Sequence, residues 1–200
     1  MDNITTPPSS LSFTTRHMQG FTLIELLVSI SIIGILSFIA LPNMSSFLAN
    51  MRVDNEISEM QRLILTARNM AMNTGKNTTI CPLASGVCTS NWHNQISVFT
   101  NGDNTLATNN TFAAPDELVK VKEAIKTGDK LQYVPSSIIF TPAGRIITTA
   151  ASFSYCPKGQ PNSSRGIDIS ISGRSYTSSD TNNDGKDENR SGSEVSCTTE

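Results

Sequence analysis

The stretch Gly20-Phe21-Thr22-Leu23-Ile24-Glu25 opens an apolar run that continues to Leu41, with Glu25 as its one charge. As a helix, the run from Phe21 to Leu41 would be roughly 31 Å long at about 1.5 Å per residue. That length matches the ~30 Å hydrocarbon core of a bilayer. A carboxylate at full depth there costs about 2.5–3.5 kcal/mol, so we expect a compensating positive charge. A cut after Gly20 would supply one, because it creates an amine at Phe21.

These residues resemble the processing motif of type IV pilins and type II secretion pseudopilins, and Gly34 and Pro42 also fall where that family tends to have glycine and proline. The resemblance implies that prepilin peptidase cuts between Gly20 and Phe21 and that Phe21 becomes the N-methylated terminus. It also implies that Glu25 pairs with the terminal amine of a neighbouring subunit and sets the assembly register. The alternative is an ordinary single-pass anchor with a glutamate near the interface.

Residues 1–20 are expected to be the leader peptide. They contain no apolar segment and no Ala-x-Ala site of a secretory signal, because the apolar run comes after the proposed cut. Arg16 lies close to the run, whereas the next cation after it is Arg52. The nearer positive charge favours a cytoplasmic leader. We therefore expect a single-pass protein of the inner membrane with its globular domain in the periplasm, which later reaches a fibre tip or the cell exterior.

A long N-terminal helix is predicted from about Phe21 to about Asn73, ending at Gly75. Residues 21–41 form its transmembrane half, and residues 42–74 continue it as an amphipathic helix. Pro42 removes a backbone donor and should kink the helix near the membrane exit. Apolar residues then recur at helical spacing. They are expected to form the face that packs on a sheet: Met44, Phe47, Met51, Ile57, Met60, Ile64, Ala67 and Ala71.

Short alternating segments follow and predict a globular β domain over residues 75–177, with a disulfide-tethered polar tail over 178–200. The fold class is therefore α+β and pilin-like, with the long helix packed on an antiparallel sheet or a small two-sheet sandwich. The predicted strands cover residues 78–81, 95–99, 118–122, 137–140, 145–147, 152–156 and 167–171. A turn at Thr141-Pro142-Ala143-Gly144 is expected to join the strands at 137–140 and 145–147 as a hairpin.

This second half also resembles the globular domain of pseudopilin H and of the minor pilins FimT and FimU. The residues that carry the resemblance are Trp92 with the apolar strand after it, Phe140 with Gly144, and Ile167-Asp168-Ile169 running into Gly173-Arg174. A strand-buried tryptophan or phenylalanine is also common in unrelated cores, so the N-terminal motif is the more specific signal.

Four cysteines fit disulfides in an oxidising compartment, and they allow three pairings. We favour Cys81–Cys88 with Cys156–Cys197, because each cross-link then fixes a segment with little core of its own. The second would tie the polar tail to a strand and remove ~3–4 kcal/mol of chain freedom from the unfolded state.

Asp180, Asn182 and Asp184, followed by Gly185, match the opening of a calcium-binding loop, which places oxygen ligands at alternate positions. The twelfth position is Ser191 rather than glutamate, and no helical pattern flanks the loop. Two interpretations stay open: a Ca²⁺ site that orders the tail, or a polar loop without metal. No other cofactor is expected.

DNA-uptake pilins of the FimT type resemble the segment Gly173-Arg174-Ser175-Tyr176 but carry a second arginine where Tyr176 stands. Phosphate binding depends on cation density, whereas acidic residues outnumber basic ones two to one between 173 and 200, and the whole chain has a net charge of −2. The sequence therefore disfavours DNA as a partner and leaves Arg174 as the candidate contact.

The sequence shows no enzyme constellation: His93 stands alone, and no Gly-x-Ser-x-Gly elbow occurs. By resemblance, we expect a structural minor pilin or pseudopilin that is a substrate of prepilin peptidase and assembles with other pilin subunits. The favoured role is a tip or assembly-priming subunit of a type IV pilus. The alternatives are pseudopilin H of a type II protein secretion system and a DNA-binding minor pilin.

Overall fold

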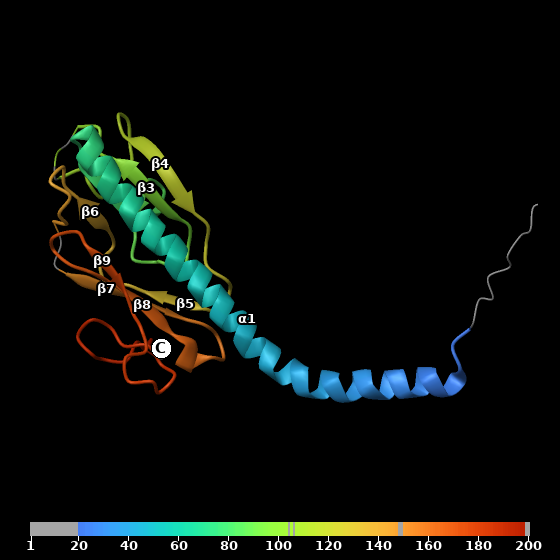
Figure 1. Cartoon of the computed structure of the whole chain (residues 1–200). Helices are drawn as coiled ribbons and strands as arrows, with labels where there is room; N and C mark the ends of the chain where they lie inside the picture. Colours follow the sequence, from blue (N-terminus) through green and yellow to red (C-terminus); the bar gives the residue numbers. More distant parts are fainter. Residues whose placement is uncertain (1–19, 104, 106, 148–149, 199–200) are drawn as a thin grey trace, which may run out of the picture. The chain divides into compact units, whose positions relative to one another are not determined.

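The computed structural model describes residues 20–198 apart from 104, 106 and 148–149, and only the backbone of residues 39–43 and 151. The chain divides into two compact units, Met1–Pro42 and Asn43–Glu200, and each is described by itself. Helix α1 (Leu23–Thr74) begins in the first unit and ends in the second (Figure 1). The predicted leader before Gly20 lies outside the described residues, as does the Pro42 side chain, so the kink stays a prediction.

Both ends of α1 follow from local chemistry. At its start, the Thr22 hydroxyl accepts a hydrogen bond from the Glu25 amide at 3.3 Å, which satisfies one of the unpaired donors of the first turn. At its end, Gly75 adopts φ +68°, and its amide donates to the Ala71 carbonyl at 3.1 Å. Glycine enters this left-handed conformation without a steric penalty. The helix predicted from the sequence is therefore confirmed.

The buried face of α1 differs in part from the predicted stripe. Met44, Phe47 and Met51 are exposed, whereas Ala49 and Val53 are buried. Val53 lies four residues before Ile57 and therefore on the same helical face, whereas Met51 points away from it. The buried residues of α1 recur at steps of three and four: Ala49, Val53, Ile57, Met60, Leu63, Ile64, Ala67 and Ala71.

The first sheet is antiparallel and has the strand order β2-β1-β3-β4, with β6 also paired to β1. Its strands are β1 (Thr78–Ala84), β2 (Val87–Cys88), β3 (Ile96–Thr100), β4 (Glu117–Lys122) and β6 (Ile138–Phe140). In β1 and β3 both faces are covered, so their side chains are buried in succession rather than in alternation.

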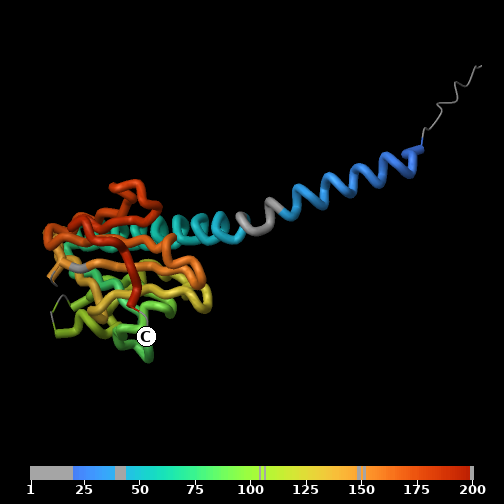
Figure 2. Tube along the Cα trace, turned by 90° about the horizontal axis from the view of Figure 1, so that it is seen from below, coloured from blue at the N-terminus to red at the C-terminus, as the bar shows by residue number. Residues whose placement is uncertain are grey.

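The second sheet is also antiparallel, with the order β5-β7-β8-β9. Its strands are β5 (Lys130–Gln132), β7 (Ala151–Cys156), β8 (Arg165–Ile169) and β9 (Ser175–Thr177), and a short 3₁₀ turn at Pro161–Ser163 precedes β8. The tail after β9 returns across this unit (Figure 2) and ends with the Thr198 amide donating to the Gln132 side chain at 3.0 Å.

Six of the seven predicted strands correspond to β1, β3, β4, β6, β7 and β8. The segment predicted as a strand over 145–147 is shortened to one antiparallel bridge, between Ile146 and Phe140. The predicted hairpin does form around the turn, because the Thr141 amide donates to the Arg145 carbonyl at 2.8 Å and the Ile147 amide donates to the Ile139 carbonyl at 3.0 Å. The Ile146 amide donates to the Ile171 carbonyl at 3.2 Å, so a loop that follows β8 holds the other edge of this segment.

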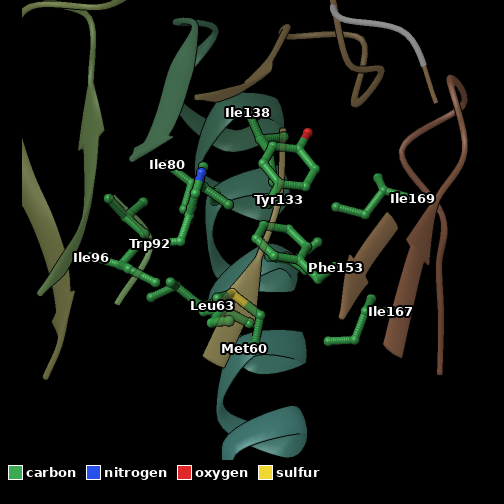
Figure 3. Packing of buried hydrophobic residues seen from close by; sticks show 14 of the residues in the cluster. Met60, Leu63, Ile80, Trp92, Ile96, Tyr133, Ile138, Phe153, Ile167 and Ile169 are labelled. Carbon is green, nitrogen blue, oxygen red and sulfur yellow. The ribbon is translucent and has the colours of Figure 1, made fainter. Parts of the chain in front are cut away.

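One hydrophobic core joins α1 and both sheets. Trp92, in the loop before β3, packs edge-on against Tyr133 and Phe153 with ring centroids 5.0 Å away, and its indole N–H donates to the Pro135 carbonyl at 2.8 Å. Figure 3 shows these rings between residues of the first sheet, such as Ile80 and Ile96, and residues of the second. Helix and sheets therefore depend on a common aromatic centre.

Two buried ionic contacts attach α1 to the sheets. The Asp129 carboxylate lies 2.7 Å from Arg52 Nε on α1 and accepts a hydrogen bond from the Tyr155 hydroxyl at 2.6 Å. Lys122 at the end of β4 lies 2.6 Å from a Glu56 carboxylate oxygen on α1. Because buried charges need partners, these pairs fix the position of the helix along the sheets.

Candidate functional site

The N-terminal motif is presented at the start of α1 in an exposed state. Gly20, Phe21 and Thr22 precede the helix, and Glu25 lies in its first turn. The side chain of Phe21 is 81% exposed, and Glu25 is exposed too. The peptide bond after Gly20 is therefore accessible, and the Glu25 carboxylate is available to a partner.

The first unit exposes an apolar surface on every side of α1. The large apolar side chains from Leu23 to Phe38 are between 47% and 84% exposed. The hydroxyls of Ser29, Ser31 and Ser37 donate hydrogen bonds to the carbonyls four residues earlier at 2.7–2.8 Å. These polar side chains therefore satisfy their donors within the helix. Exposed apolar surface on this scale marks an interaction with membrane or protein.

A candidate membrane-spanning helix is not found among the described residues. The predicted transmembrane segment 21–41 ends among residues 39–43, whose side chains lie outside the described part.

The predicted calcium loop lies between β9 and the tail. The Asp180 carboxylate accepts hydrogen bonds from the amides of Asp184 and Gly185 at 3.2 and 2.9 Å. The Asn182 side chain accepts from the Asp184 amide and donates to the Asp184 carboxylate. The structure adds Glu188 to this group: one carboxylate oxygen each of Asp180, Asp184 and Glu188 lie within 4.8 Å of one another.

Arg174 directly precedes β9, the strand that carries Tyr176. The guanidinium of Arg190, from the tail, lies 4.0 Å from the centroid of the Tyr176 ring. Hydrogen bonding to Arg190, and secondly to Arg174, lowers the pKa of Tyr176. Tyr176 and Arg190 also line a surface pocket with Asp168. The spacing of the sequence does not reveal this second cation, because Arg190 arrives from a different segment.

Both disulfides follow the pairing that the sequence favoured. Cys81 is joined to Cys88 at the turn between β1 and β2, and Cys156 at the end of β7 is joined to Cys197 in the tail. The second bond holds the tail against the strand that carries Tyr155.

Gly144 and Gly173, the two glycines named in the resemblance to pseudopilin H, lie close together in the structure. Gly144 and Gly173 have φ of +70° and +76°, and a Cβ on Gly173 would overlap the Gly144 carbonyl oxygen. Arg68 on α1 donates to that same oxygen at 3.0 Å. The close contact between these two loops, which lie far apart in the sequence, therefore requires glycine at position 173.

Sequence reasoning missed Glu188, Asp129, Lys122 and Arg190. Glu188 alone had a local signal, because it stands at the ninth position of the calcium-type loop, where such loops often carry a ligand. The partners of Asp129 and Lys122 lie on α1, and no spacing rule connects them.

Comparison with known proteins adds two family matches. The family described as "Type II transport protein GspH" matches residues 56–173, and the "Prokaryotic N-terminal methylation motif" matches residues 15–41. The first match spans the buried half of α1 and most of both sheets, and the second spans the sequence around Gly20 and Glu25.

Curated relatives include a "Fimbrial protein" of Pseudomonas aeruginosa, 43% identical over 61 residues, which are 30% of this chain and 39% of that protein. The "Type IV major fimbrial protein FimA" of Dichelobacter nodosus is 32% identical over 113 residues, 56% of this chain and 66% of that protein. The chain therefore matches less than two thirds of the length of each relative.

Among solved structures, the type IV minor pilin FimU of Pseudomonas aeruginosa gives a TM-score of 0.49 at 19% identity, covering 65% of this chain and 90% of that one. The minor pseudopilin EpsH from the type II secretion system of Vibrio cholerae gives 0.45 at 13% identity, covering 63% and 95%. The sequence match across more than half of the chain decides the family: this protein belongs to the type II transport protein GspH family and carries the prokaryotic N-terminal methylation motif.

Proposed function

We propose that the protein is a minor pilin or pseudopilin, a structural subunit that waits in the inner membrane and then enters a periplasmic fibre. The observation that carries this proposal is the exposed N-terminal motif on an exposed apolar helix, within the segment that matches the methylation motif. Prepilin peptidase would cut between Gly20 and Phe21 and methylate Phe21.

Assembly follows from the same chemistry. The apolar half of α1 would bundle with the equivalent helices of other subunits, which removes its side chains from water or lipid. Glu25 would meet the terminal amine of a neighbour in a region of low dielectric constant, where an unpaired charge is costly. The pair would therefore set the register of the subunit, with the globular domain facing outward.

The first experiment identifies the mature N-terminus of the membrane-extracted protein by mass spectrometry. We expect Phe21 bearing one added methyl group, and a mature chain beginning at any other residue would contradict the proposal. The second follows Glu25→Leu, which should be processed normally but excluded from fibres. Glu25→Asp is the matched control: it keeps the charge and should be incorporated.

A subunit of the type IV pilus is the favoured role, because the curated relatives are fimbrial proteins. Pseudopilin H of a type II secretion system is the alternative, which the family match supports. Deletion of the gene distinguishes the two: loss of piliation with intact exoprotein secretion supports the pilus, and the reverse supports secretion.

DNA binding is a second candidate function, favoured by the approach of Arg190 to Tyr176 beside Arg174. An aromatic ring next to two guanidinium groups can stack on a base and contact phosphate. A gel shift that weakens with salt and is lost in Arg174→Ala, but retained in Lys76→Ala, would support it. An absence of any shift with the wild-type protein would exclude it.

A further inference from the structure

Three acidic side chains converge where the tail folds back after β9. Asp180 and Asp184 lie on the outgoing loop and Glu188 on the returning segment, and one carboxylate oxygen of each lies within 4.8 Å of the others. Like charges at this separation repel one another, so the cluster needs a reason to persist.

Glu188 provides an independent observation. Glu188 is only 5% exposed. Its Oε2 accepts hydrogen bonds from the Thr181 amide at 2.7 Å and the Thr181 hydroxyl at 2.6 Å. Its Oε1 is buried and has no hydrogen-bond donor among the residues that the structure describes.

The nearest lysine does not supply that donor. Lys186 instead directs its ammonium group to Glu194, 2.8 Å away. A buried carboxylate oxygen without a partner is destabilising, and a bound cation would remove that penalty.

We propose that Asp180, Asp184 and Glu188 bind a calcium ion. Calcium prefers carboxylate and carbonyl oxygens at about 2.3–2.6 Å. Two oxygens that each lie about 2.4 Å from one ion are at most about 4.8 Å apart, and the three carboxylate oxygens lie within that limit. Magnesium demands near-ideal octahedral geometry and usually keeps several waters, and the set lacks the nitrogen and sulfur ligands typical of zinc.

The residue spacing of the loop around the cluster matches that of a calcium-binding loop. Asp180, Asn182, Asp184 and Glu188 occupy its first, third, fifth and ninth positions, and Gly185 adopts φ +87° at the turn. The Asn182 side-chain oxygen, a backbone carbonyl and water would complete the coordination. Glu188 therefore extends the ligand set predicted from the sequence, which ended at Asp184.

Binding would stabilise the tail as well as the loop. Glu188 and Ser179 exchange both backbone hydrogen bonds, at 3.0 and 3.2 Å, so a bound ion would fix the loop at its base beside β9. Calcium outside the inner membrane would thus hold the surface that carries Arg190 and Tyr176. This role goes beyond fibre assembly.

Calcium chloride is titrated into the full chain in detergent micelles after a chelator has removed bound metal. Calorimetry measures the heat of binding, and a melting curve measures the midpoint of thermal unfolding. We expect one calcium per chain with a Kd of about 10⁻⁴–10⁻³ M, as in extracellular calcium modules. The thermal midpoint should rise with calcium concentration, and magnesium should bind at least about tenfold more weakly.

Two variants separate a metal site from a purely structural role of the glutamate. Glu188→Gln keeps the shape of the side chain and should lose at least about tenfold in calcium affinity, whereas its melting without calcium should not fall. Glu194→Gln removes one negative charge from the same tail outside the cluster and should change the affinity by less than about twofold.

Asp184→Asn changes a proposed ligand that is exposed, so this substitution disturbs no buried side chain. It should weaken calcium binding as well. The proposal is overturned if millimolar calcium gives no heat and no change in the melting of the wild-type protein. It is overturned too if Glu188→Gln lowers the thermal midpoint by the same amount with and without calcium. Glu188 would then only accept the hydrogen bonds of Thr181.

Discussion

Asp129→Ala should loosen the attachment of α1 to the second sheet. The carboxylate is 1% exposed and serves three donors. These are Arg52 Nε at 2.7 Å, the Tyr155 hydroxyl at 2.6 Å and the Lys158 amide at 2.8 Å. The substitution therefore removes one group on which the helix, a strand and a loop depend.

The magnitude follows from what each donor loses. The Tyr155 hydroxyl stays buried without an acceptor, which costs about 1–3 kcal/mol, and the Lys158 amide loses a bond worth about 1 kcal/mol. The Arg52 side chain is 24% exposed, so water can replace part of its contact and its share is about 0–1 kcal/mol. We expect a loss of about 2–5 kcal/mol, a large part of the about 5–15 kcal/mol that stabilises a typical domain.

Urea unfolding of the full chain in detergent, followed by the fluorescence of the single tryptophan, measures this loss. Trp92 is suitable because it lies in the core against Phe153, which is on the same strand as Tyr155. Tyr155→Phe should cost less, and combining it with Asp129→Ala should give less than the sum, because the two residues share one hydrogen bond.

Glu123→Ala is the matched control, since this carboxylate is exposed and bonds only weakly to Gln95 at 3.3 Å; it should change stability by less than about 0.5 kcal/mol. An Asp129→Ala protein within about 1 kcal/mol of wild type would refute the reasoning, because a buried carboxylate with these partners cannot be removed so cheaply.

Three further predictions concern pH, the tail and a close glycine contact. Burial, and then its bond to Asp129, raises the pKa of Tyr155 above the ordinary 10.0, so the unfolded chain loses this proton first. Stability should fall above pH 10 by up to about 1.4 kcal/mol per pH unit, and urea titrations should show a smaller fall in Tyr155→Phe. Replacing Cys156 and Cys197 with serine opens a loop with a sequence separation of 41 and should cost about 4 kcal/mol, measured by urea unfolding. Gly173→Ala should lower the thermal midpoint more than Gly192→Ala, because both have positive φ but only Gly173 also meets a backbone oxygen; equal effects would contradict the clash.

Much of the fold could be predicted because its signals are local. The period of the apolar residues predicted α1, Gly75 predicted its end, and alternation predicted six strands. The errors occurred where a local pattern was ambiguous: Met51 and Val53 are both apolar, and only the position of the sheets decides which of them is buried. The short strands β2, β5 and β9 carry too few residues to show alternation.

The candidate sites were predictable where their residues are contiguous in the sequence and unpredictable where the residues come from distant segments. The stretch Gly20–Glu25 and the loop at Asp180–Gly185 are contiguous, so the sequence alone determined where to look. Glu188 is close in sequence, but its burial and its unpaired oxygen emerge only when the tail folds back on Ser179. Arg190 reaches Tyr176, and Arg52 reaches Asp129, across separations that no motif encodes.

The sequence by itself determined the long helix, the processing motif and the strand-rich second half, because backbone preference and hydrophobic period act between neighbours. Only the tertiary structure decided which face of α1 is buried, which charges pair across the core and which carboxylates gather beside β9. Those outcomes depend on the burial of groups that are distant in the chain, and burial is a property of the packed molecule.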